Sequence, residues 1–154
     1  MDQITKYLIR HTINPEEERL VIRGFFKLVH WHNTGAAWSM FKDSNALLAV
    51  VAVAALLGLY FSRHHFEAHT LSGQFALGLI FGGILGNLMD RIFVDHVTDF
   101  LYFYIQRRGG PEAYFPAFNI ADSGISIGVA LIFLISLRQG AQDNEGGVTQ
   151  GQTQ

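Results

Sequence analysis

The sequence has 154 residues, of which 49% are hydrophobic and only 16% are charged, and its mean hydropathy is +0.22. A soluble domain usually carries about a quarter charged residues, so this composition indicates a membrane protein. The net charge of -2 provides no basic surface for nucleic acid, and the absence of cysteine excludes disulfides and thiol nucleophiles.

The first forty residues predict an extramembrane region without a cleavable signal peptide. Residues 1–20 are polar, with a turn signal at Asn14-Pro15, and they contain no apolar core long enough for a signal peptide. Residues 19–41 contain pairs of adjacent residues that favour β-strands, and Gly24 and Asn33-Thr34-Gly35 interrupt this run. This pattern favours short strands lying on the membrane surface.

Three apolar segments have the length of membrane spans. No residue is charged between Asp43 and Arg63 or between His69 and Asp90. Each gap is close to the roughly 20 residues that a helix needs to cross the hydrocarbon. From Ala113 to Leu137 the only charge is Asp122, which predicts a third span with its polar phrase, residues 119–123, at one end.

The remaining segments complete a single membrane-embedded domain over residues 1–138. Residues 90–116 form a second extramembrane segment, with Gly109-Gly110-Pro111 as a loop. The tail over residues 139–154 has little to bury, and we expect it to be disordered.

The chain crosses the membrane twice between residues 19–41 and residues 90–116, so these two segments lie on the same side. Seven polar groups then converge on one membrane face: Asn33, Asn87, Asp90, Arg91, Asp99, Asn119 and Asp122. A carboxylate beside a membrane span is costly and indicates a functional site. Two carboxylates that share a proton can activate a water and protonate a departing amine, which is aspartic protease chemistry.

Each of these residues also has an interpretation without catalysis. Asp122 suits the cap of a helix, Asp90 and Arg91 suit a neighbouring ion pair, and Asn87 suits a hydrogen bond between helices. Anchoring alone does not explain so many polar groups on one face.

Other catalytic classes have weaker signals. Ser123 lies outside any Gly-x-Ser-x-Gly elbow, and no histidine is evidently placed to serve it. His30 and His32 would share a strand face, but they lack a convincing third ligand for zinc.

Five phrases follow one another along the chain: Asp2-Gln3-x-Thr5-Lys6, Asn33-Thr34-Gly35-Ala36-Ala37, Gly86-Asn87-x-x-Asp90-Arg91, Val97-Thr98-Asp99-Phe100 and Phe118-Asn119-x-Ala121-Asp122-Ser123. In this order they resemble the bacterial lipoprotein signal peptidase family, the type II signal peptidases. The resemblance runs from Asp2 to about Leu137. It implies an α-helical membrane protein, a transmembrane helix bundle with a small extracytoplasmic β-cradle at residues 19–41 and a mobile flap-like arm after Arg91.

The activity implied by the resemblance is that of a membrane aspartic endopeptidase. Such an enzyme cleaves signal peptides from diacylglyceryl-modified prolipoproteins, just before the lipidated cysteine. The resemblance places the catalytic pair on Asp99 and Asp122 and implies no metal and no organic cofactor. It assigns substrate positioning to Asn33, Asn87, Arg91 and Asn119, and mainly structural roles to Asp2, Lys6, Gly35 and Asp90.

The implied location is the bacterial inner membrane, with several spans and the active site at the extracytoplasmic face. The expected partners are diacylglyceryl prolipoproteins and membrane lipids, without nucleic acid, and we expect a monomer. Only Arg63 and Arg138, of eleven Lys and Arg residues, fall on the side expected to be cytoplasmic, which opposes the positive-inside bias.

Two features depart from the family pattern. Family members have four spans, and the phrase at Asp2 follows most of the first one, so we expect that the first span is largely missing here. Trp38 stands where phenylalanine is common, which predicts a conservative packing change.

Two rival functions belong to other classes. A small membrane transporter would use Asp90, Asp99 and Asp122 as a proton or substrate relay. A relay should extend through the spans, yet the first two spans have no interior charge. A structural module for assembling other membrane proteins would not require the aspartate pair.

Overall fold

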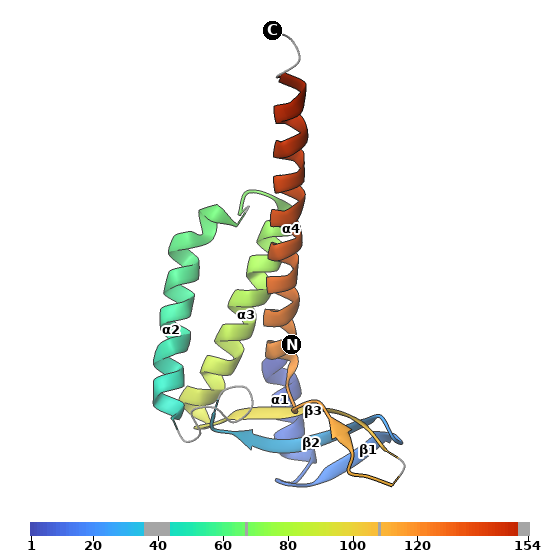
Figure 1. Ribbon diagram of the computed structural model, residues 1–154. Coiled ribbons are helices and arrows are strands. Elements are labelled where there is room, and N and C mark those ends of the chain that lie inside the picture. The colour runs from blue at the N-terminus through green and yellow to red at the C-terminus, as the bar shows by residue number, and fades with distance from the viewer. Residues whose placement is uncertain (36–43, 67, 108, 151–154) are drawn as a thin grey trace.

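The computed structural model describes residues 1–35, 44–66, 68–107 and 109–150, with side chains described to residue 138. Three long helices, α2 (Asn45–Ser62), α3 (Leu71–Phe93) and α4 (Ile120–Gln150), form a bundle with a small sheet across one end (Figure 1). Within the described residues, three segments are long and apolar enough to cross a membrane: Asn45–His65, Leu71–Phe93 and Ile120–Arg138. The prediction of three spans is confirmed.

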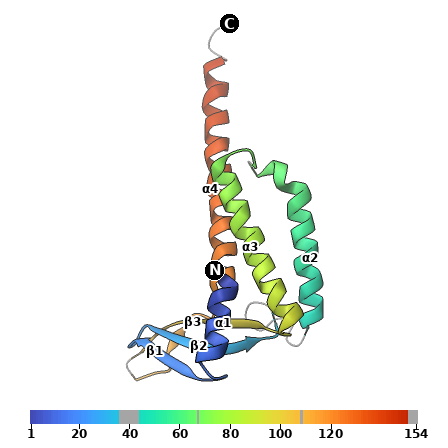
Figure 2. The same ribbon diagram turned by 180° about the vertical axis from the view of Figure 1, so that it is seen from behind.

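The exposed surface of the long helices is apolar, as is typical of helices that contact lipid. No residue of α2, all of which is described, is buried, and its exposed side chains include Val50, Leu57 and Phe61. A helix that exposes apolar side chains all round is stable in hydrocarbon, where its backbone groups are paired within the helix. α3 lies between α2 and α4 and packs against both (Figure 2).

The helix boundaries follow local hydrogen bonds. α3 begins after Thr70, whose side-chain Oγ1 accepts a hydrogen bond from the backbone N–H of Gly73 at 3.1 Å. A 3-10 turn, Arg63–His65, ends α2. α4 begins at Ile120, in the polar phrase of residues 119–123 that was expected at one end of the third span. Residues before it pair with the sheet, through strand β4 (Ala113–Tyr114) and a bridge from Phe118.

The sheet is antiparallel, with strand order β1-β2-β3-β4. β1 (Glu18–Ile22) and β2 (Phe26–Asn33) are the short strands predicted for residues 19–41, and β3 (Val97–Ile105) comes from the second extramembrane segment. These two segments lie on the same side of the bundle, as alternation of the spans predicts (Figure 1). Trp38 lies outside the described residues.

A helix that the sequence did not predict packs beside the sheet. α1 (Asp2–Thr12) buries Lys6 and Ile9, and Ile9 joins Ile13 and Phe100 of β3 in a small apolar core. The buried positions 6, 9 and 13 follow the spacing of one helix face. α1 therefore connects the sheet to the ends of α3 and α4 (Figure 2).

The organisation of the chain into a domain over residues 1–138 and a disordered tail stays a prediction. The backbone of α4 is helical to Gln150.

Candidate active site

α3 and α4 approach closely beside the sheet because glycine stands at their contact. A Cβ atom on Gly83 would lie only 2.6 Å from Cγ1 of Ile125. Such a distance is too short for two carbon atoms, so a larger residue would push the helices apart. The close packing brings the last turns of α3, with Asn87 and Arg91, beside the first turn of α4, with Asp122.

Asp99 is a buried carboxylate on β3, with 4% of its surface exposed. It lies opposite Trp31 of β2, where the register between the two strands shifts. Asn33 Nδ2 donates to its Oδ2 at 2.9 Å, and Asn119 Nδ2 donates to its Oδ1 at 2.8 Å. The pKa of Asp99 is raised to about 7: burial raises it most, the charge of Asp122 raises it as well, and the two amide donors lower it.

Asp122 occupies the first turn of α4. It caps this helix and also belongs to the set of polar residues that were expected on one membrane face. The backbone N–H of Asn119 donates to Asp122 Oδ2 at 3.2 Å, and the backbone N–H of Asp122 donates to Asn119 Oδ1 at 3.0 Å. These reciprocal bonds form a capping box. The other oxygen, Oδ1, accepts from Asn87 Nδ2 at 2.7 Å. The capping interpretation is thus correct, and it does not exclude the carboxylate pair.

Three asparagine amides each direct their NH2 group at an aspartate. In every case the amide oxygen has its own donor: the backbone N–H of Gly35 for Asn33, the Lys6 ammonium for Asn87 and the backbone N–H of Asp122 for Asn119. An amide whose oxygen is held in this way can turn only its nitrogen toward the neighbouring carboxylate. Asn119 contacts both aspartates, so it fixes their relative position.

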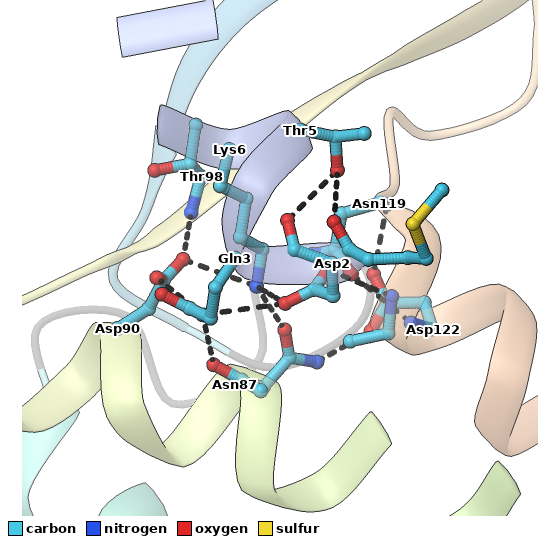
Figure 3. A network of polar contacts seen from close by, with 12 residues as sticks. Asp2, Gln3, Thr5, Lys6, Asn87, Asp90, Thr98, Asn119 and Asp122 are labelled. Atoms are coloured by element: carbon cyan, nitrogen blue, oxygen red, sulfur yellow. Dashed lines mark hydrogen bonds and ion pairs between the residues drawn. The ribbon is translucent and has the colours of Figure 1, made fainter. Parts of the chain in front are cut away.

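A buried ionic network supports this group from the α1 side (Figure 3). Lys6 Nζ lies 3.0 Å from Asp2 Oδ2 and 3.1 Å from Asp90 Oδ2, and Arg10 Nη1 lies 3.3 Å from Asp90 Oδ1. Asp90 Oδ2 also accepts from the backbone N–H of Thr98, the residue before Asp99, at 3.0 Å. The network therefore ties α1 and α3 to the strand that carries Asp99.

Both aspartates line a cavity of about 1170 Å³ between the sheet and the helices. Asn33, Asn87 and Arg91 line it as well, so five of the seven predicted polar residues meet there. Asn119 is fully buried behind the aspartates, and Asp90 lies in the ionic network instead of the cavity wall. Around the polar centre the walls are largely apolar or aromatic: Trp31, Val97, Tyr114, Phe115, Phe118, Ile125 and Ile127.

The contacts correct one alternative interpretation and confirm another. Asp90 pairs with Lys6 and Arg10 and not with its neighbour Arg91, whose Nη2 donates to the carbonyl of Gly35 at 2.9 Å. Asn87 bridges α3 and α4, as expected for a bond between helices, but its acceptor is an aspartate of the cavity.

The remaining candidates have other partners. Ser123 lines the cavity, but its hydroxyl donates to the carbonyl of Asn119 at 3.1 Å. His30 Nδ1 lies 2.8 Å from the carbonyl of Ile13. Across the described ranges, no three His, Asp or Glu side chains are arranged to hold a metal ion.

Several supporting residues were missed as members of the site: Gln3, Arg10, Trp31 and Thr98. Asp2, Lys6 and Asp90, for which a mainly structural role was expected, lie in the ionic network, and none of their partners was predicted. The spacing of Asp2 and Lys6, four residues apart, is a signal for a pair on one helix face that could have revealed α1.

Comparisons with known proteins give consistent results. The sequence model of the family described as "Signal peptidase (SPase) II" matches residues 1–138. A lipoprotein signal peptidase of Symbiobacterium thermophilum is 42% identical over 135 residues, which cover 87% of this chain and 85% of the relative. One of Bacillus pumilus is 34% identical over 146 residues, with 94% and 90% covered.

A solved structure has the same arrangement of helices and sheet. It is described as a bacterial membrane enzyme determined by the in meso method at 2.3 Å resolution. Its TM-score to this chain is 0.77 at 33% sequence identity, and the match covers 92% of this chain and 83% of that chain.

Proposed function

The chain belongs to the signal peptidase II family, and we propose that it removes signal peptides from diacylglyceryl-modified prolipoproteins as an aspartic endopeptidase. Asp99 and Asp122 are its catalytic pair. The observation that carries this assignment is the position of Asn119, which hydrogen-bonds to both carboxylates at the edge of one cavity. A pair held in this way can act on one water.

The two aspartates divide the proton between them. Asp99 holds it, because its burial favours the neutral carboxyl group. Asp122 carries the negative charge, because it accepts two N–H bonds and lies at the N-terminal end of α4, where the helix dipole favours an anion. The pair titrates as a unit, so this is its starting state and not two independent values.

Hydrolysis follows from this starting state. Asp122 takes a proton from the water as the water oxygen attacks the scissile carbonyl carbon, and Asp99 gives its proton to the carbonyl oxygen. The C–N bond of the tetrahedral intermediate then breaks. Asp122 passes its proton to the departing amine, and Asp99 recovers one from the intermediate's hydroxyl group, which restores both carboxyl groups.

The other cavity residues organise the reaction. Asn33 and Asn87 hold the aspartates with their amide nitrogens, and Asn119, which is fully buried, does the same. The Arg91 guanidinium holds the Gly35 carbonyl, and its buried Nε has no partner among the described residues. We propose that this Nε–H donates to a carbonyl of the bound peptide.

The protein spans a membrane several times, and we place it in the bacterial inner membrane. The active site then belongs to the extracytoplasmic face: the sheet lies at one end of the spans (Figure 1), and the cavity is lined by residues of the sheet and of the adjoining helix ends. A lipid-modified substrate reaches such a site from within the bilayer. We propose that the protein is a monomer that contacts membrane lipids and cleaves prolipoproteins without a cofactor.

A transporter is disfavoured by the distribution of charge. Asp90, Arg91 and Asp122 all lie at the helix ends beside the sheet, and no charged residue lies within Leu71–Met89 or within α2. A relay across the membrane would need such groups farther along the spans.

Cleavage of a defined substrate tests the proposal. The purified protein is reconstituted in phospholipid vesicles and incubated with a diacylglyceryl-modified prolipoprotein, and the products are analysed by mass spectrometry. We expect a single cut just before the lipidated cysteine. The same prolipoprotein without the diacylglyceryl group is the control and should remain largely uncut. No cleavage of either form, or equal cleavage of both at another bond, would contradict the proposed function.

A further inference from the structure

Lys6 is a fully buried lysine with three acceptors around its ammonium group. Nζ lies 3.0 Å from Asp2 Oδ2, 3.1 Å from Asp90 Oδ2 and 2.8 Å from Asn87 Oδ1 (Figure 3). A buried ammonium needs opposite charge, and the two carboxylates provide it. Arg10, which also contacts Asp90, balances the second carboxylate. The bond to Asn87 is not needed for charge balance, so it requires another explanation.

The bond from Lys6 fixes the direction of the Asn87 amide. An ammonium group only donates, so the amide must turn its oxygen toward Lys6 and its NH2 group away. The NH2 group then donates to Asp122 Oδ1 at 2.7 Å. Without a donor at residue 6, the amide can rotate and direct its oxygen at Asp122. Two oxygens then face each other, an arrangement that suits a protonated Asp122 and disfavours the ionised one.

Four other ionisable groups act on Asp122: Asp99 from β3, Arg91 from α3, and Asp2 and Lys6 from α1. Asp2 and Asp99 oppose its negative charge, whereas Arg91 and Lys6 favour it. Lys6 acts through Asn87 as well as through its charge, because the amide lies in contact with both residues. Two successive hydrogen bonds, with the Asn87 amide between them, therefore link the α1 helix to the carboxylate of Asp122.

We infer that Lys6 is a positioning residue for proteolysis: it orients the Asn87 amide so that Asp122 remains the ionised member of the pair. This inference rests on the proposed function, since it concerns the carboxylate that activates the water. Lys6 is fully buried and does not line the cavity, so it does not touch the substrate.

The test compares two neutral side chains at residue 6 that differ in having a donor. Both are made together with Asp2→Asn, which removes one carboxylate so that Asp90 and Arg10 still balance. In Lys6→Met the donor is absent, whereas in Lys6→Gln an NH2 group can still donate to Asn87 Oδ1. Asp2→Asn alone is the reference. The readouts are kcat, KM and the pH dependence of kcat/KM in vesicles.

We expect Lys6→Met to move the acid limb of kcat/KM to higher pH by about one unit, the usual scale of a lost hydrogen bond to a charged group. KM should change less than about two-fold, because the substrate contacts are intact. Lys6→Gln should move the limb less than Lys6→Met does, because it loses the charge of Lys6 but keeps a donor to Asn87. A merely structural role would lower the amount of active enzyme in both variants and give both the same limb.

Two results would overturn the inference: an unmoved limb in Lys6→Met, or shifts of equal size in Lys6→Met and Lys6→Gln. If Lys6→Met does not fold, Lys6→Leu takes its place as the neutral variant without a donor, and the same comparison with Lys6→Gln decides. These outcomes differ from a failure of the proposed function, in which the unmodified protein itself would not cleave the lipidated substrate.

Discussion

Asp99 is buried and accepts hydrogen bonds from two amides, and these two features shift its pKa in opposite directions. Burial favours the neutral carboxyl group, while the donors from Asn33 and Asn119 favour the charged one. The resulting pKa, about 7, is suited to a group that gives a proton near neutral pH. Activity should then fall as the pH rises above 7, because Asp99 loses the proton that it must donate.

Replacement of Asn33 by leucine tests this balance. Asn33→Leu removes one donor to the ionised carboxylate, so the pKa of Asp99 should rise and the alkaline limb of kcat/KM should move to higher pH by about one unit. The pH profile of cleavage in vesicles measures the shift. Asn14→Leu, an exposed asparagine far from the cavity, is the control and should leave the profile unchanged. A limb that moved to lower pH would contradict this account.

Individual site residues could be identified from the sequence more readily than their contacts. Asp99, Asp122, Asn33, Asn87 and Arg91 were expected on one face, and all line the cavity. Their phrases are local, and the apolar segments between them fix their side of the membrane. The partner of Asp90 could not be identified, because Lys6 and Arg10 lie on a helix eighty residues away.

At the scale of elements, the contact between α3 and α4 determines the geometry of the site. Both helices are almost uniformly apolar, so hydrophobicity does not specify which faces meet. Small residues do, because they allow the backbones to approach. Gly83 contacts α4, whereas its neighbour Gly82 has open space where a side chain would stand.

The pair Gly82 and Gly83 gives a matched test of this packing. In Gly83→Ala the new methyl group would collide with Ile125, which should lower the free energy of unfolding by about 1–3 kcal/mol and reduce kcat by displacing Asp122. Gly82→Ala should be neutral or slightly stabilising, since alanine favours a helix more than glycine does. Thermal unfolding in detergent and cleavage rates measure both effects. Equal effects of the two substitutions would refute this role of Gly83.

The elements differ in how far the sequence predicts them. The spans follow from gaps in charge, and the strands of residues 19–41 follow from β-prone pairs between breakers. Helix α1 was not predicted because its buried face includes Lys6. A lysine is normally exposed, so the spacing of apolar residues alone does not indicate this face. The start of α4 follows from the polar phrase of residues 119–123, whereas the pairing of Ala113–Tyr114 and Phe118 with the sheet was not predicted.

At the scale of the whole molecule, the orientation in the membrane remains the point at which two sequence signals disagree. The sheet lies at one end of the spans, and the turn between α2 and α3 lies at the other (Figures 1 and 2). The proposed function requires the sheet outside, although most Lys and Arg residues lie at that end.

Single cysteines can determine the orientation, because the natural chain has none. Arg23→Cys lies exposed in the turn between β1 and β2, and His64→Cys lies exposed between α2 and α3. A membrane-impermeant maleimide should label Arg23→Cys in intact spheroplasts and should label His64→Cys only after permeabilisation. The unsubstituted protein controls for background. The reverse pattern would place the active site on the cytoplasmic side.

Removal of each carboxylate in turn shows whether Asp99 and Asp122 together perform the cleavage. Asp99→Asn and Asp122→Asn are purified, checked for an unfolding temperature close to that of the unmodified protein, and assayed with the diacylglyceryl prolipoprotein in vesicles. Asp95→Asn is the control: Asp95 is exposed, and its φ of 63° is one that asparagine also tolerates.

We predict that each active-site variant loses about 10³-fold or more in kcat, while Asp95→Asn retains the rate of the unmodified protein. A folded Asp99→Asn or Asp122→Asn protein that still cleaved the lipidated substrate at the unmodified rate would contradict the account.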